Sequence, residues 1–204
     1  MRVDPFQVVR DFESMLCDYT GAKYAVTVTS CTSAIMIACA YHRTMTGPRT
    51  VIIPKHTYVG VAMAITLAGH TIDFEDRNWT GEYEIVPLNV WDAARWFTSP
   101  MAFGTQMMSC VSFHPTKTLG LSGYGGAILH NDDKADEWLR RARFDGRAEG
   151  VAPKDDTFTM IGAHCYMSPQ TAAEGLLRLS TLPAENEPIP NDDYPDLSQM
   201  EIFK

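Results

Sequence analysis

The chain has 204 residues, of which 45% are hydrophobic and 21% are charged. This composition is typical of a globular protein with one core, so we expect one main domain. The formal net charge of −8 argues against a broad surface that binds the phosphate backbone of nucleic acids. A local basic groove at the arginines of WLRRARFDGR stays open, although such a run is more often a solvated helix face.

No run of residues is apolar and long enough to cross a membrane, and the N-terminal residues MRVDPFQVVRDFE lack the apolar core of a signal peptide. We therefore expect a cytoplasmic protein. The five cysteines are spread over the chain without a CxxC pair, which predicts buried free thiols rather than disulfides or a zinc site. No pair of histidines has metal-ligand spacing with a carboxylate, so we predict no metal.

The spacing of apolar residues predicts an alternation of strands and helices along the chain. We expect, in order, a helix at 5–18, a strand at 24–29, a helix capped by Ser30, a strand at 49–54, a helix at 58–69, a strand at 71–76, a strand that ends near Asp92, strands at 107–114 and 125–131, and helices at 132–146 and 168–179. This order indicates an α/β fold with a mostly parallel central sheet.

The C-terminal residues differ from the rest of the chain in composition. Residues 183–204 are rich in proline and acidic side chains and show no periodicity. We predict a domain over residues 1–182 and a tail over residues 183–204 that is disordered or lies on a partner.

Polar side chains follow several of the predicted strands. Ser30, Thr32 and Ser33 come between the first strand and its helix, where hydroxyls and free amides at a helix N-terminus can hold a phosphate. Asp92 and Lys117 each follow a later strand, and ligands of parallel sheets bind at the carboxyl ends of the strands. The plain alternatives are a capped helix, a loop anchor and a surface lysine.

Taken together, these groups predict a site for pyridoxal phosphate. That cofactor needs an anchor for its phosphate, a carboxylate that keeps the ring nitrogen protonated, and an amine that forms a Schiff base. Tyr58, which follows IIPKHT, can offer a flat surface to the cofactor ring.

Seven segments occur in an order that resembles the DegT-type (StrS-like) sugar aminotransferases. They are YAVTVTSCTSAIMIA, IIPKHTYVGVAMAITLAG, VWDAARWF, SFHPTKTLG, GYGGAILHNDD, RARFDG and YMSPQTAA. The resemblance spans residues 8–182 and implies the large domain of the fold type I pyridoxal-phosphate enzymes, a three-layer α/β sandwich. It also implies a shortened member that lacks the small C-terminal domain of that family.

The resemblance implies a role for individual residues. Lys117 would be the catalytic lysine that forms the Schiff base, and Asp92 would pair with the pyridine nitrogen of the cofactor. Thr32, Ser33 and Ser112 would hold its phosphate. The family consists of homodimers with active sites at the interface, so the resemblance also implies a homodimer.

The further positions include one that matches the family, Tyr58, and two that depart from it, Arg95 and His164. Tyr58 would stack on the cofactor ring, and Arg95 stands where the family has Gln or His beside that ring. His164 stands where the family has an Asn that reaches the phosphate of the neighbouring subunit. His56 and His114 lie close in sequence to these positions and are further candidates for contact with a ligand.

The function that the resemblance implies is amino transfer to a small-molecule substrate. One alternative is a decarboxylase or lyase that acts on an amino acid, including one attached to a large substrate such as modified nucleic acid. The other alternative is a non-catalytic subunit that keeps the fold and supports an active partner.

Overall fold

The structure, a computed structural model, describes residues 4–102 and 104–204. Its helices are α1 (Gln7–Thr20), α2 (Cys31–Thr46), α3 (Val59–Leu67), α4 (Asp133–Arg143) and α5 (Pro169–Leu179). Its strands are β1 (Tyr24–Val28), β2 (Thr50–Pro54), β3 (Thr71–Glu75), β4 (Tyr83–Ile85), β5 (Val90–Ala93), β6 (Met108–Ser112) and β7 (Gly126–His130). Short 3-10 turns occur at Pro153–Asp155, Leu197–Gln199 and Glu201–Phe203.

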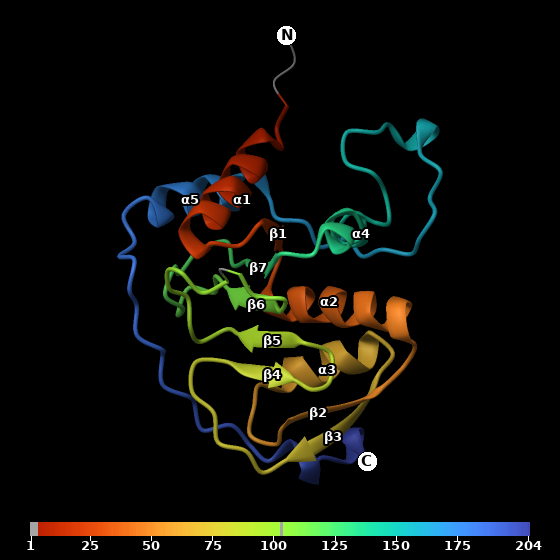
Figure 1. Ribbon diagram of the computed structural model, residues 1–204, viewed down its shortest axis with the longest axis vertical. Coiled ribbons are helices and arrows are strands. Elements are labelled where there is room, and N and C mark those ends of the chain that lie inside the picture. Colours follow the sequence, from red (N-terminus) through yellow and green to blue (C-terminus); the bar gives the residue numbers. More distant parts are fainter. Residues whose placement is uncertain (1–3, 103) are drawn as a thin grey trace.

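The strands form a five-stranded sheet in the order β1-β7-β6-β5-β4 and a two-stranded sheet of β2 and β3 (Figure 1). Strands β5 and β6 pair in parallel, whereas β7 and β4 are antiparallel to their neighbours. An antiparallel bridge between Ile52 and Val86 joins the two sheets and gives β2 the direction of β5. Strands β1, β2, β3, β5 and β6 therefore point the same way, as the sequence predicts.

Helices cover both faces of the sheet, which makes three layers. Along β1, Val26 and Val28 belong to the core beneath α2, α3 and α4, whereas Ala25 belongs to the core beneath α1 and α5. Strand β7 alternates in the same way, with Ile128 on one side and Leu129 on the other. Because successive side chains of a strand point to opposite faces, two cores require strands that are apolar at nearly every position.

The helices and most strands agree with the sequence prediction within a few residues. Ser30 caps α2 by accepting a hydrogen bond from the backbone amide of Ser33 at 3.1 Å, which confirms its predicted role. The strand predicted to end near Asp92 is present as β5, but the prediction missed β4, which precedes it and pairs with it antiparallel. Each has only three or four residues, which is too short for a clear periodic pattern.

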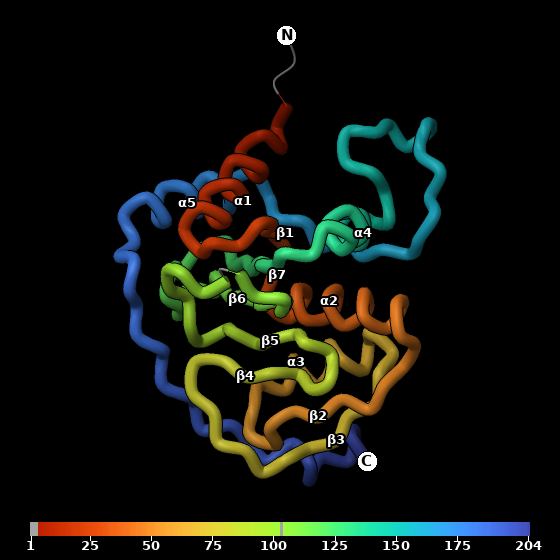
Figure 2. The backbone as a smooth tube through the Cα atoms, in the orientation of Figure 1, coloured from red at the N-terminus to blue at the C-terminus, as the bar shows by residue number. Residues whose placement is uncertain are grey.

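Residues 183–204, called the C-terminal strap below, lie along the chain itself. Figure 2 shows the strap, in blue, passing the ends of the strands from α5 to the β2-β3 sheet. Backbone hydrogen bonds join Ser99 to Ala184 and Leu197 to Lys55, and the side chain of Leu197 is fully buried. The prediction that this segment is disordered is therefore wrong, because backbone hydrogen bonds and the buried side chain of Leu197 hold it on the same chain.

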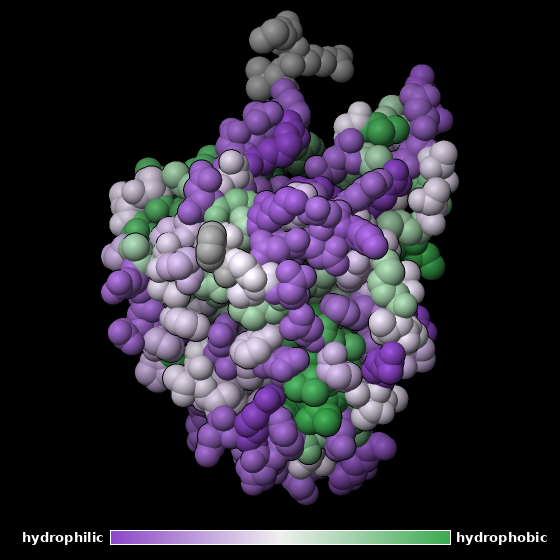
Figure 3. Space-filling model, in the orientation of Figure 1, coloured by the Kyte–Doolittle hydropathy of each residue, from purple (hydrophilic) through white to green (hydrophobic). Residues whose placement is uncertain are grey.

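The surface seen in Figure 3 is mainly hydrophilic, with a hydrophobic patch in its lower half. Within residues 4–102 and 104–204, no helix is long and apolar enough to span a membrane.

The arginines of α4 do not form an open basic groove. Arg143 is buried and pairs with Glu13 and Glu149, and Arg140 pairs with Glu13 at 2.7 Å. Carboxylates of the same chain thus neutralise these two arginines. Arg143 therefore belongs neither to an open basic groove nor to a solvated helix face, and both interpretations are wrong for this residue.

Candidate active site

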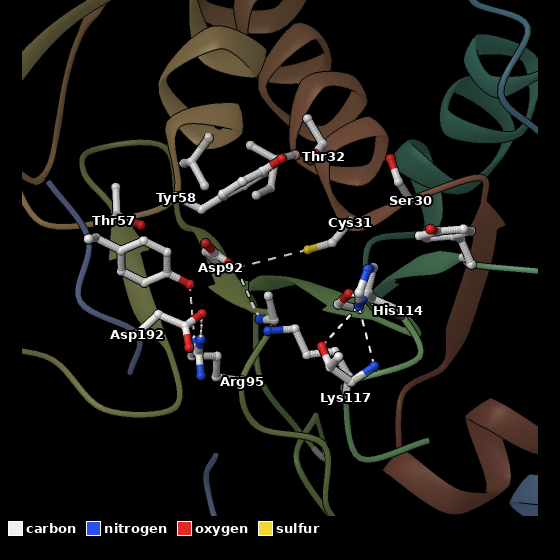
Figure 4. Close-up of a pocket in the computed structure, with 18 of the residues that line it drawn as sticks. Ser30, Cys31, Thr32, Thr57, Tyr58, Asp92, Arg95, His114, Lys117 and Asp192 are labelled. Carbon is white, nitrogen blue, oxygen red and sulfur yellow. Dashed lines mark hydrogen bonds and ion pairs between the residues drawn. The ribbon is translucent and has the colours of Figure 1, made fainter. Parts of the chain in front are cut away.

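A cavity of about 530 Å³ lies where α2, α3 and the loops after β5 and β6 meet (Figure 4). Its volume falls within the range of about 300–1,000 Å³ that is usual for small-molecule sites. The predicted site residues that line it are Thr32, Tyr58, Asp92, Arg95, Ser112 and Lys117. Long-range pairing of β5 with β6 thus brings together side chains that are far apart in the sequence.

Asp92 lies at the floor of the cavity and is 4% exposed. Its Oδ1 accepts a hydrogen bond from the amide of Ala94 at 3.0 Å, and its Oδ2 accepts one from the hydroxyl of Tyr83 at 3.0 Å. The Tyr83 hydroxyl also bonds that of Thr57, at 2.7 Å. Burial raises the pKa of Asp92, and the hydrogen bonds from Ala94 and Tyr83 and the charge of Lys117 offset only part of this effect. The result is a carboxyl group in a fixed orientation.

Lys117 extends from the loop after β6 and is half-buried in the cavity wall. Burial lowers its pKa, and the charge of Arg95 lowers it further, against the opposing effects of Asp192 and Asp92. The loop turns sharply at Gly120, where φ is +55° and a Cβ would lie 2.9 Å from the carbonyl oxygen of Pro115. A lysine with a lowered pKa has a larger neutral fraction, which is the form that attacks a carbonyl group.

The start of α2 forms another wall of the cavity. Thr32 and Ser112 line the cavity, and the first amides of a helix have no partners within that helix. Ser33 does not line the cavity, because its hydroxyl bonds the hydroxyls of Ser30 at 2.9 Å and Thr29 at 3.1 Å. Hydroxyls and free amides at a positive helix end can bind an anion such as a phosphate group.

Strand β7 lies directly against this helix start. A Cβ on Gly126 would come within 2.6 Å of the amide nitrogen of Cys31, so the backbone approach requires glycine. The Cys31 thiol donates to the carbonyl oxygen of Cys110 at 3.3 Å and lies 3.9 Å from Oδ1 of Asp92. Burial raises the pKa of Cys31 well above its usual range, which keeps it a thiol.

Tyr58 presents its ring at the cavity from the N-terminus of α3 and is 54% exposed. The ring lies over Gly60, where a Cβ would be 2.5 Å from Cε1 of the tyrosine. The position of this flat side chain therefore depends on the absence of a side chain at residue 60. Figure 4 shows Tyr58 on the side of the cavity that also carries Thr32.

Two of the candidate histidines lie apart from the cavity. His164 is exposed, and its Nδ1 lies 2.9 Å from Oδ2 of Asp145. His56 bonds the carbonyl oxygen of Tyr194 at 2.9 Å and does not line the cavity, whereas His114 does. No group of three or more His, Cys, Asp or Glu side chains that could hold a metal ion occurs in the described part of the chain.

The C-terminal strap supplies cavity residues that the sequence analysis missed. Asp192 and Tyr194 line the cavity and both contact Arg95. Arg95 is 4% exposed, and its Nε donates to the hydroxyl of Tyr194 at 3.2 Å while its other nitrogens donate to the Pro190 carbonyl and the Asp192 carboxylate. No local pattern signals these contacts, since they join residues more than ninety positions apart.

A three-layer α/β fold that gathers a lysine, a buried aspartate and a hydroxyl-bearing helix start around one cavity is the architecture of fold type I pyridoxal-phosphate-dependent enzymes. Residues 4–90 and 101–188 match the model of the DegT/DnrJ/EryC1/StrS aminotransferase family. The chain belongs to this family, as the resemblance of its motifs implies.

Individual relatives agree with this assignment. The chain is 26% identical to a UDP-2-acetamido-2-deoxy-3-oxo-D-glucuronate aminotransferase of Pseudomonas aeruginosa, over 65% of this chain and 48% of that protein. A DegT DnrJ EryC1 StrS aminotransferase from Brucella abortus is similar in structure, with a TM-score of 0.71, 21% identity, and coverage of 86% of this chain and 59% of that one.

A further structure of this fold is NtdA from Bacillus subtilis, which contains the bound cofactor PMP. It has a TM-score of 0.72 and 20% identity, and the similarity covers 86% of this chain and 48% of NtdA. The chain thus spans about half the length of the Pseudomonas aeruginosa aminotransferase.

Proposed function

We propose that the protein is a pyridoxal-phosphate-dependent aminotransferase of the DegT type, with Lys117 as the residue that forms the Schiff base. The observation that supports this most is the convergence of three groups on one cavity: an amine whose pKa is lowered, a buried carboxyl group and a helix N-terminus that carries hydroxyls. Membership of the aminotransferase family supports the same conclusion.

The donor set of the cavity fits this cofactor. Thr32, Ser112 and the free amides at the start of α2 would hold its phosphate, and the exposed ring of Tyr58 would lie against its ring. Asp92 would pair with its ring nitrogen. The cavity of about 530 Å³ has room for such a group together with a small substrate.

When bound, the cofactor supplies an aldehyde that condenses with amines and a ring that withdraws electrons from the carbon next to the nitrogen. The chain supplies the proton transfers. Lys117, once released, would remove a proton from the substrate carbon and return it at the cofactor carbon, because its lowered pKa increases the fraction of neutral amine that can act as a base. Asp92 would hold a proton on the ring nitrogen.

Two further site residues are proposed on family position and on their place in the fold. Ser33 would support the phosphate site through its bond to Ser30. His164 would act on the neighbouring subunit of a homodimer, and its exposed position apart from its own cavity is compatible with that role. The substrate would be a small nucleotide-linked keto or amino sugar, as in the relatives. The cytoplasmic location and the division of the chain at residue 182 stay predictions.

The test is to load the protein with pyridoxal phosphate, reduce it with borohydride and map the modified peptide. We expect a yellow absorbance before reduction and a covalent adduct on Lys117 after it. Lys117→Ala should lose both, whereas Lys154→Ala, which removes an exposed lysine, should keep both. An adduct that persists in Lys117→Ala would refute the assignment of this lysine.

A second measurement separates the catalytic alternatives. Glutamate added to the loaded protein should convert the cofactor to its amine form, because an aminotransferase first accepts the amino group of a donor. A protein that binds the cofactor but converts no amino donor would favour the decarboxylase or lyase. A protein that binds no cofactor would favour the non-catalytic subunit.

A further inference from the structure

The buried guanidinium of Arg95 is bound entirely by the C-terminal strap. Its Nε donates to the Tyr194 hydroxyl, its Nη1 to the carbonyl oxygen of Pro190, and its Nη2 to the carboxylate of Asp192. The Tyr194 ring also lies against the guanidinium, with the Arg95 Cζ 5.6 Å from the ring centre. Figure 4 shows Arg95 and Asp192 together at one side of the cavity that holds Lys117.

The two members of this ion pair differ strongly in their exposure to water. The side chain of Arg95 is 4% exposed, whereas that of Asp192 is 70% exposed. A buried guanidinium cannot lose its proton and needs a negative partner, while a carboxylate near the surface is almost as well solvated without one. Arg95 therefore depends on a carboxylate, but the particular carboxylate of Asp192 is exchangeable.

We infer that Arg95 is the binding site for a carboxylate group of the substrate, and that Asp192 occupies this site until such a ligand replaces it. The inference rests on the proposed function in one respect, namely that the substrate enters this cavity.

The remaining contacts of Arg95 explain why the ligand group would be a carboxylate. Tyr194 and Pro190 hold Nε and Nη1, so the guanidinium keeps its orientation when Asp192 leaves. Nη2 is then left without its partner as a charged donor of a residue that lines the cavity, at the place where a carboxylate oxygen was bound.

The charge balance at Lys117 favours the same exchange. Burial is the main cause of the lowered pKa of Lys117, and the charge of Arg95 lowers this pKa further. The charge of Asp192 raises it. A ligand carboxylate in place of Asp192 keeps a negative charge beside Arg95 and leaves this balance intact. A neutral ligand that displaced Asp192 would leave a buried positive charge without a partner.

Both halves of the contact lie outside the part of the chain that matches the family model. The matched stretches are residues 4–90 and 101–188, so Arg95 falls between them and residues 190–194 follow the second.

The inference can be tested by calorimetric titration of the cofactor-loaded protein with carboxylates that cannot donate an amino group. Glutarate represents the carboxylate of an amino donor, and D-glucuronate represents that of an acidic sugar. Glutaramide and D-glucose are the matched neutral probes. We expect Asp192→Asn to bind at least one of the carboxylates roughly fivefold more tightly than wild type, because the internal competitor is gone. The affinity for the neutral probes should not change.

Asp193→Asn is the matched control, because it removes the same charge from the adjacent exposed residue and should leave every affinity unchanged. Arg95→Lys should weaken carboxylate binding about tenfold, since one ammonium cannot donate to Tyr194, Pro190 and the ligand in the directions that the guanidinium provides. If that variant does not fold, the comparison of Asp192→Asn with Asp193→Asn decides alone.

Equal affinities of Asp192→Asn and Asp193→Asn for both carboxylates would overturn the inference. An effect with glutarate alone identifies the amino donor as the source of the carboxylate, and an effect with D-glucuronate alone identifies the sugar. The visible absorbance of the same samples reports cofactor binding separately. A yellow protein without the Asp192 effect would therefore reject this inference and not the proposed function. If the protein binds no cofactor, the same titration of the unloaded protein still tests whether Arg95 binds a carboxylate.

Discussion

Replacement of Tyr83 by Phe should destabilise the protein mainly when Asp92 is ionised. The hydroxyl of Tyr83, a residue that is 3% exposed, donates to Asp92 at 3.0 Å and bonds the Thr57 hydroxyl at 2.7 Å. Loss of a hydrogen bond to a buried charge costs about 2 kcal/mol, and the unpaired Thr57 hydroxyl adds about 1 kcal/mol. The phenylalanine ring keeps the edge contact with Trp79, whose ring centre is 4.7 Å away. We therefore expect the free energy of unfolding to fall by about 3 kcal/mol at neutral pH.

The dependence on pH separates this effect from a loss of packing. Burial raises the folded-state pKa of Asp92, so the ionised group lowers stability as the pH rises from the ordinary aspartate range through that folded-state pKa. Without the Tyr83 hydroxyl the pKa of Asp92 rises further, so the deficit of the variant should grow as the pH rises through the folded-state pKa of Asp92, and it should be larger at about pH 7 than at about pH 4.

Urea unfolding of the cofactor-free protein at both pH values measures this difference. Tyr166→Phe is the control, because it removes the hydroxyl of a half-buried tyrosine that lies outside the hydrogen bonds around Asp92, and its effect should stay within about 0.5 kcal/mol. A deficit of Tyr83→Phe that is the same at both pH values would refute the argument.

Two other substitutions test the charges of the fold and of the site. Burial would raise the pKa of Glu13, but Arg143 and Arg140 outweigh it and lower the pKa, so Glu13→Gln should cost about 3 kcal/mol in urea unfolding and the deficit should vanish as the pH falls through the folded-state pKa of Glu13. Competitive acetylation of the cofactor-free protein should give Lys117 a pKa below the ordinary lysine range, and Arg95→Met should move it upward while burial still holds it low.

The features around the cavity whose position can be predicted from the sequence are those that local pattern determines. Ser30 precedes an apolar helical run and follows a strand, so its role as a cap can be recognised from a few residues. Lys117 follows β6 and Asp92 lies near the end of β5, and the shared direction of these two strands brings both residues to one edge of the sheet.

The parts that escaped prediction depend on contacts across long stretches of chain. Tyr83 lies opposite Asp92 in the β4-β5 ladder, but β4 has three residues and no periodic signal. Arg143 is on a helix whose sequence is typical of a solvated surface helix, yet its side chain is buried because it pairs with Glu13, 130 positions away. Partner choice in such ion pairs is set by tertiary packing, which composition and periodicity do not encode locally.

The way in which the C-terminal strap is held explains how the Asp192 side chain can leave Arg95 while the strap itself stays in place. Near its start, the carbonyl oxygen of Ala184 accepts the amide of Ser99, and near its end Leu197 is buried and bonds the backbone of Lys55. Between these anchors the strap carries proline and exposed acidic residues and buries little apolar surface. Its position over the cavity therefore depends on hydrogen bonds and charge rather than on the hydrophobic effect, and contacts of that kind can be replaced by a ligand of the same charge without disturbing the core.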